Sequence, residues 1–202
     1  MRKQLYLFAT LLVILSGCSK ENELKKSVMI YDPEFTDLPV YSEWGYNTFG
    51  AYYDREVFIS DDITVPAKVV VSDGAMSFVL NGHKGAYYYY DESNRMNLTL
   101  RLPGFTPDGY SDMIILNDTV FDLTNPDCQV VVESEGNPIN TFSIISGAFQ
   151  FKRAQNLLVD KQQVEVILSG YFELKALING QPVTISDGRF DVGIGPDNFY
   201  IY

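Results

Sequence analysis

Residues that could carry out nucleophilic or acid–base chemistry are few and scattered along this sequence. A catalytic thiol needs an imidazole beside it, but Cys128 lies far along the chain from His83, the single histidine. We therefore expect Cys128 to be a buried, free cysteine. Acidic pairs such as Asp61-Asp62, or Asp54 with Glu56, are what a glycosidase would hold at a fixed separation. With 26 acidic residues in the chain, such pairs arise by chance.

Sequence motifs of the common catalytic and metal sites are missing. There is no Gly-x-Ser-x-Gly elbow, no His-Glu-x-x-His and no phosphate-binding glycine loop. A single histidine excludes a multi-histidine zinc site. Oxygen ligands for Ca²⁺ are present, but their order does not match the EF-hand loop, and solvated turns explain them equally; they are Asp108, Asp112, Asp118, Asp122 and Asp127. We expect a non-catalytic protein with no metal and no cofactor.

Aromatic side chains are the more suggestive feature. Trp44 lies in a tyrosine-rich segment, and four consecutive tyrosines follow later: Tyr87, Tyr88, Tyr89 and Tyr90. Successive residues of a strand face opposite sides of the sheet, so two of the four tyrosines point away from the core unless both faces are covered. Exposed rings beside acidic groups would form a platform for glycan. The alternative is core and strand packing, because tyrosine favours strands.

The first residues resemble the signal of bacterial lipoproteins. Arg2 and Lys3 precede an apolar run over residues 5–15, which is too short to span a bilayer but suits a secretory signal. The run ends in Leu15-Ser16-Gly17-Cys18, which resembles a lipobox. That resemblance implies a diacylglycerol on the Cys18 thiol and cleavage just before it. The alternative is an ordinary signal peptide with an incidental cysteine.

This interpretation sets the domain boundaries and the partners. Residues 1–17 are the signal peptide, residues 18–26 a charged, flexible tether, and residues 27–202 a single domain. A lipidated Cys18 leaves Cys128 without a disulfide partner. The net charge of −11 disfavours nucleic acid. We expect a protein of the bacterial cell envelope, held on the outer membrane by its N-terminal lipid and facing the periplasm or the cell surface.

Short apolar runs alternate with turn residues through the rest of the chain, which predicts an all-β fold. Breaks at Asp73-Gly74, Asn81-Gly82, Asn179-Gly180 and Asp187-Gly188 suit tight turns. One helix is an alternative over residues 154–160. We predict an antiparallel β-sandwich, with a lipocalin-like β-barrel as the alternative. The expected strands span residues 50–53, 56–60, 68–72, 76–81, 86–90, 96–102, 112–116, 120–123, 129–133, 141–145, 148–152, 163–168, 171–177, 183–185, 189–194 and 199–202.

A further resemblance lies near the C-terminal end. Gly188-Arg189-Phe190-Asp191, after Val183-Thr184-Ile185, together with the lipobox, is similar to uncharacterised Bacteroidota lipoproteins. That resemblance implies an extracytoplasmic β domain and carries no catalytic motif. We expect a binding module whose ligand is a glycan. The alternative is a structural or assembly component of an envelope or surface complex.

Overall fold

The computed structural model describes residues 25–60, 65–85, 94–134, 140–178 and 180–202. These residues are predominantly β-strand, as the sequence predicts, with one short 3-10 helix among them. The elements are β1 (Thr48–Tyr53), β2 (Glu56–Ile59), β3 (Ala67–Ser72), β4 (Ala75–Lys84), β5 (Arg95–Pro103), η2 (Tyr110–Leu116), β6 (Thr119–Asp122), β7 (Gln129–Ser134), β8 (Asn140–Thr141), β9 (Ser143–Val159), β10 (Gln162–Ile178), β11 (Gln181–Ile194) and β12 (Phe199–Ile201).

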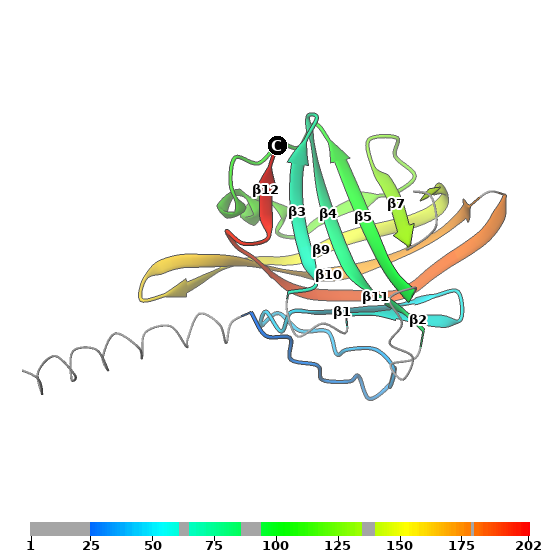
Figure 1. Ribbon diagram of the computed structural model, residues 1–202, viewed down its shortest axis with the longest axis horizontal. Helices are drawn as coiled ribbons and strands as arrows, with labels where there is room; N and C mark the ends of the chain where they lie inside the picture. Colours follow the sequence, from blue (N-terminus) through cyan, green and yellow to red (C-terminus); the bar gives the residue numbers. More distant parts are fainter. Residues whose placement is uncertain (1–24, 61–64, 86–93, 135–139, 179) are drawn as a thin grey trace, which may run out of the picture.

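All described strands belong to one curled sheet. Its order is β6-β9-β10-β11-β1-β2-β4-β5-β7-β8, and β3 adds to β4 while β12 adds to β3. The β12–β3 pair is parallel and the other pairs are antiparallel. The sheet curls into a half-barrel, with β3, β4, β5 and β7 facing β9, β10 and β11 (Figure 1). The all-β prediction is confirmed. The two separate sheets of a sandwich are not, because the described strands follow one continuous hydrogen-bonded path.

The core fills the inside of this curl and is rich in phenylalanine. Phe78 of β4 packs against Phe149 and Phe151 of β9 and Phe190 of β11, with ring centroids 5.3–5.9 Å apart. All four rings are buried. Edge-to-face and tilted ring pairs add about 0.5–1.5 kcal/mol each beyond the area that they bury. These contacts hold the two sides of the curl together.

Strands β9, β10 and β11 are longer than the sequence pattern indicates. The segments that we expect as separate strands on either side of Gly170 form one strand, β10. A Cβ at Gly170 would lie 1.8 Å from the carbonyl oxygen of Gln150, so this glycine serves a close backbone approach and not a turn. Similarly, Asp187 (φ 54°) lies within β11, where the register with β1 and β10 shifts. The predicted turn there is a bulge.

Three further predictions are wrong for identifiable reasons. Asn81-Gly82 lies inside β4, and a Cβ at Gly82 would lie 2.3 Å from the carbonyl oxygen of Ile59 on neighbouring β2. Residues 112–116 belong to η2 and not to a strand: Met113 and Leu116 are buried with the three-residue spacing of a 3-10 helix. Residues 154–159 continue β9, and the chain reverses at Asp160 and Lys161, which both have positive φ.

The hairpin predictions at two other turns agree with the structure. Asp73-Gly74 joins β3 to β4, with Ser72 paired to Ala75. Strands β10 and β11 pair antiparallel up to Ile178 and Gln181, as a hairpin at Asn179-Gly180 requires. The predicted strand over residues 86–90 lies outside the described residues. Asn-Gly and Asp-Gly pairs therefore predict hairpin turns correctly where no neighbouring strand packs against the glycine.

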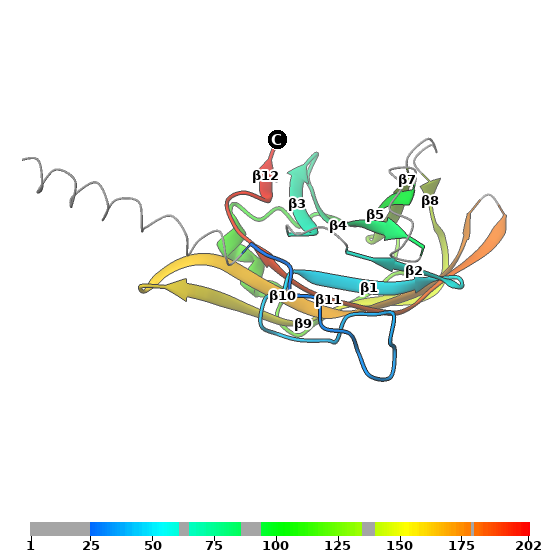
Figure 2. The same ribbon diagram turned by 60° about the horizontal axis from the view of Figure 1, so that its bottom comes forward.

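The chain from Lys25 to Asn47 runs across the outside of the curl. It lies below β1 and β11 in Figure 1, on the side away from β3, β4 and β5, and comes forward in Figure 2. Arg189 of β11 donates from Nη1 to Asp32 Oδ2 at 2.7 Å, and its guanidinium lies 4.7 Å from the centroid of the Phe35 ring. Arg189 and Asp191 of the Gly188–Asp191 motif thus bind this segment, while Phe190 enters the core.

Candidate functional site

A groove opens at one end of the curled sheet, and we call it the end groove. It has a volume of about 680 Å³, within the usual range for ligand pockets. It forms where the starts of β3, β5, η2 and β10 meet the chain that follows β11. The lining residues are Lys25, Val65, Pro66, Ala67, Lys68, Asn81, Arg95, Tyr110, Gln163, Val164, Glu165, Gly195, Pro196, Asp197, Asn198 and Tyr200.

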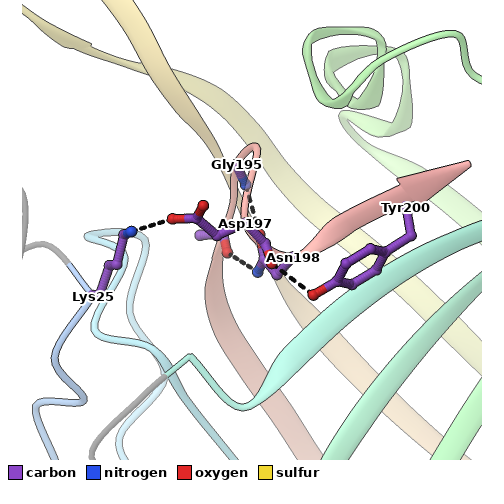
Figure 3. A network of polar contacts seen from close by, with 6 residues as sticks. Lys25, Gly195, Asp197, Asn198 and Tyr200 are labelled. Atoms are coloured by element: carbon purple, nitrogen blue, oxygen red, sulfur yellow. Dashed lines mark hydrogen bonds and ion pairs between the residues drawn. The ribbon is translucent and has the colours of Figure 1, made fainter.

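Asn198 holds the frame of the end groove. Its Nδ2 donates to the carbonyl oxygens of Ala67 (3.0 Å) and Gly193 (2.9 Å), and its Oδ1 accepts the N–H of Gly195 at 2.8 Å. Figure 3 shows Asn198 at the centre of this network, beside Gly195. One amide therefore ties the turn after β11 to the start of β3. Because its donors and acceptor are used internally, Asn198 is a positioning residue for the groove.

Tyr110 and Tyr200 line the end groove, and the hydroxyl of each forms a hydrogen bond with a backbone carbonyl oxygen. Tyr110 donates to the carbonyl oxygen of Gln163 at 3.2 Å, and Tyr200 donates to that of Asp197 at 2.7 Å. Lys25 forms an ion pair with Asp197 across the rim (Figure 3). The hydroxyl bonds hold both rings in place; Tyr110 also packs against the core, and Tyr200 stacks on Tyr202 with ring centroids 6.4 Å apart.

Glu165 is the partly buried acid of the end groove. Its side chain lies against Gly193 of β11 and Gly195 just after that strand: a Cβ at Gly193 would be 2.2 Å from Glu165 Oε2, and a Cβ at Gly195 would be 3.0 Å from Glu165 Cγ. Burial raises the pKa of the Glu165 carboxyl above its ordinary value of 4.5; the positive charge of Lys25 opposes this and the negative charge of Asp197 adds to it. The oxygens of this carboxyl can accept hydrogen bonds.

Charge is nearly balanced in the end groove. Lys25, Lys68 and Arg95 line it together with Glu165 and Asp197, whereas the whole chain carries −11. The groove therefore lacks the strong positive field that would attract a nucleic acid and the strong negative field that would attract a cation. A neutral, polar ligand suits this balance.

A second feature is the turn that carries Trp44. The indole is 77% exposed, whereas Asp191, which holds the turn, is only 1% exposed. Asp191 accepts the N–H groups of Trp44 (3.2 Å), Gly45 (2.9 Å) and Tyr46 (3.0 Å), and also the hydroxyl of Ser42. Charge-assisted hydrogen bonds of this kind are among the stronger ones in proteins. The turn is therefore fixed although its tryptophan lies in solvent.

Tyr41 adds an aromatic pair next to this turn. Its ring stacks on Tyr171 of β10, with centroids 4.4 Å apart, and its hydroxyl donates to Glu43 at 2.9 Å. Burial and the neighbouring Glu43 raise the pKa of the Tyr41 hydroxyl well above its usual range. The hydroxyl therefore stays protonated and keeps donating to Glu43.

The structure separates the residues that the sequence offers for chemistry. His83 of β4 and Cys128, just before β7, lie beside different parts of β5, because His83 pairs with Arg95 and Gln129 pairs with Arg101. Six residues of strand separate these positions, about 20 Å. Cys128 is free and half-buried, directly before β7, and burial raises the pKa of its thiol.

The acidic pairs have structural partners where they are described. Asp54 lies in the β1–β2 turn with φ 55° and accepts the N–H of Thr184 at 2.8 Å. Glu56 forms an ion pair with Lys84 at 2.9 Å. Asp61-Asp62 lies outside the described residues. These contacts account for Asp54 and Glu56 as stabilising groups of the sheet.

The acidic loops cap their own turns. Asp122 accepts the N–H and the hydroxyl of Thr124, at 2.9 and 2.7 Å, and Asp112 accepts the N–H of Asp108 at 3.0 Å. Within the described part of the chain, no three His, Cys, Asp or Glu side chains gather where they could hold a metal ion. Asp112 and Asp122 thus stabilise the local turns in which they lie.

Of the predicted site residues, Trp44 alone falls within the described ranges. Cys18, Tyr87, Tyr88, Tyr89 and Tyr90 lie outside them. The end groove itself is a site that the sequence analysis missed. Its sequence signal is the alternation Val192-Gly193-Ile194-Gly195, because glycine on one face of a strand marks a close approach by another group.

Comparisons of the chain with protein-family models, with curated proteins and with solved structures gave no match. Among the described residues, no helix has the length and apolar character needed to span a membrane.

Proposed function

We propose that this protein is a non-catalytic binding module that takes a glycan in the end groove. The observation that carries the proposal is the lining of this groove, where two tyrosines lie beside amides and the partly buried Glu165. Ligand pockets combine apolar contact area with a few fixed polar groups that set orientation. Sugars present both C–H faces and hydroxyl groups, so they match such a lining.

Hydrogen-bonding capacity supports a hydroxyl-rich ligand. The side chain of Asn198 and the two tyrosine hydroxyls already form hydrogen bonds with the backbone around the groove. Glu165, Asn81 and Gln163 line the same space, and their carboxyl and amide groups can form hydrogen bonds with hydroxyl groups. A buried polar group that loses its ligand partner costs about 1–3 kcal/mol, so the groove would discriminate in favour of hydroxyl groups.

We also propose that the protein is a lipoprotein of the bacterial envelope, anchored to the outer membrane through Cys18. The support is the lipobox-like sequence and the course of the chain after it. Lys25 follows Cys18 by seven residues and already pairs with Asp197 at the groove rim. Seven extended residues span at most about 25 Å. With a lipid on Cys18, the end groove would therefore open within about 25 Å of the membrane surface.

A glycan array probed with the mature chain tests the proposed function. Cys18→Ser keeps the protein in solution, and this background is compared with the additional change Glu165→Ala. The matched control is Glu173→Gln, an exposed acid on the same strand. We expect binding that Glu165→Ala weakens at least tenfold and that Glu173→Gln leaves intact. Failure to bind any glycan would contradict the proposal, and shortening of a bound glycan would contradict the non-catalytic role.

A role as an assembly component is the second candidate, and a different surface supports it. Ile115 of η2 and Val120 of β6 are 69% and 57% exposed, and β6 is the first strand of the sheet path. Exposed apolar side chains beside an edge strand suit a protein partner. Charged substitutions at Ile115 and Val120 would then abolish copurification with an envelope complex while glycan binding persists.

A further inference from the structure

The turn that carries Trp44 crosses three adjacent strands at positions that pair with one another. These positions are Gln155 of β9, Ile167 of β10 and Gly193 of β11, where Ile167 pairs with both of the others. The side chain of Gln155 donates to the carbonyl oxygen of Glu43, and the N–H of Gly193 donates to Asn47 Oδ1 at 2.9 Å. Between these two contacts, Gly45 packs against Ile167. Residues 43–47 therefore form a bar across the outer face of β9, β10 and β11.

Glu165 occupies the next position along this same face. It precedes Ile167 by two residues on β10, so both side chains point to one side of the strand and their Cα atoms are about 7 Å apart. Gly193 contacts both features: a Cβ there would lie 2.2 Å from Glu165 Oε2 and 3.5 Å from Asn47 Oδ1. The end of the groove that holds Glu165 and the bar that carries Trp44 are thus direct neighbours.

The backbone that carries the Trp44 side chain is fixed before any ligand arrives. Asp191 holds the backbone of Ser42 to Tyr46 through the hydrogen bonds described above, while the indole remains 77% exposed. A group already held in its bound position loses less conformational freedom when it binds. Tryptophan is also the residue type most enriched among the side chains that dominate binding energy.

We propose that the end groove and the Trp44 indole bind one extended oligosaccharide, with one sugar unit at Glu165 and a later unit stacked on the indole. This inference rests on the proposed function, and it adds that the ligand is a chain longer than two sugars. A short glycan fills the groove alone, whereas a longer one crosses the bar formed by residues 43–47 and covers Trp44.

The test measures how affinity depends on chain length. The probes are cello-, xylo- and manno-oligosaccharides, each as the disaccharide and the hexasaccharide. Trp44 is the single tryptophan of the chain, so its fluorescence reports directly on contact with the indole. We expect the hexasaccharide of a bound series to bind about tenfold or more tightly than the disaccharide, and only the hexasaccharide to change the Trp44 emission.

Two variants make the result decisive. Trp44→Ala should bring the hexasaccharide Kd to that of the disaccharide. Tyr31→Ala, which removes an exposed aromatic outside the groove lining, should keep the length dependence. Equal affinity for both lengths, or a length dependence that survives Trp44→Ala, would overturn this inference while the proposed function stands. Failure of every probe to bind would overturn the proposed function and this inference with it.

Discussion

The Asp191 carboxylate accepts the backbone N–H of Trp44 at 3.2 Å. This contact joins a side chain that is almost fully buried to a residue whose ring lies in solvent. The two residues are 147 positions apart in the chain, so the Trp44 turn depends on the tertiary structure.

Asp191→Asn should release the Trp44 turn. The amide keeps the shape of the carboxylate but loses its charge and one of its acceptor oxygens, while the N–H groups of Trp44, Gly45 and Tyr46 remain near it. We expect a loss of about 2–4 kcal/mol in unfolding free energy, since hydrogen bonds to charged groups contribute about 1.5–3 kcal/mol each. Denaturant unfolding gives this value, and the anisotropy of Trp44 fluorescence should fall in the folded state.

Glu173→Gln on β10 is the control for that change, and as an exposed substitution it should alter stability by less than about 0.5 kcal/mol. An Asp191→Asn protein with unchanged stability and unchanged Trp44 anisotropy would show that Asp191 does not hold the turn.

Glu165 should make stability depend on pH. Its folded-state pKa is raised above the ordinary value of 4.5, so the folded state binds the proton more tightly than the unfolded chain. The carboxyl therefore opposes folding increasingly as pH rises from its ordinary pKa through the raised one, and not below that window. Glu165→Gln removes this cost. The Tm of Glu165→Gln minus that of the wild type should increase from about pH 4 to pH 7.

Thermal melts over this pH range measure the difference. If the difference instead decreases with rising pH, the Lys25 charge outweighs burial, and the carboxyl is stabilised in its ionised form.

Gly170→Ala should disturb the β9–β10 pairing. A methyl group there would lie 1.8 Å from the carbonyl oxygen of Gln150 and 2.9 Å from the Phe190 ring, and backbone cannot move aside as a side chain can. Overpacking in a core costs about 1–3 kcal/mol and sometimes more, so we expect at least about 2 kcal/mol. Gly109→Ala is the control, because its nearest neighbour would be 3.7 Å away. Similar unfolding free energies for the two variants would contradict the close approach at Gly170.

Cys18→Ala tests the proposed anchor in cells. Because the thiol of Cys18 is the expected acyl acceptor, the variant should lose labelling by a palmitate analogue and leave the membrane fraction for the soluble or unprocessed pool. Two acyl chains hold a protein firmly on a bilayer, whereas unmodified protein has no such anchor. Cys128→Ala is the control and should keep both label and location. A Cys18→Ala protein that still labels and still pellets with membrane would contradict the anchor.

The candidate site was largely outside the reach of sequence reasoning. Trp44 could be selected as a candidate because it lies in a tyrosine-rich segment of the sequence, but its exposure and the fixation of its backbone by Asp191 could not be predicted. The end groove combines Tyr110, Glu165 and Asn198, which come from three separate segments. No local pattern relates them, since their proximity depends on how the sheet curls.

The sequence by itself determined the all-β class and the hairpin at Asp73-Gly74. Alternation of apolar residues and turn chemistry act over a few neighbouring residues, so they can be recognised locally. The tertiary structure decided which glycines lie inside strands, as Gly82 and Gly170 do, because only a neighbouring strand shows that a Cβ would collide there. It also decided the single curled sheet and the groove at its end, since these depend on pairings between residues far apart in the chain.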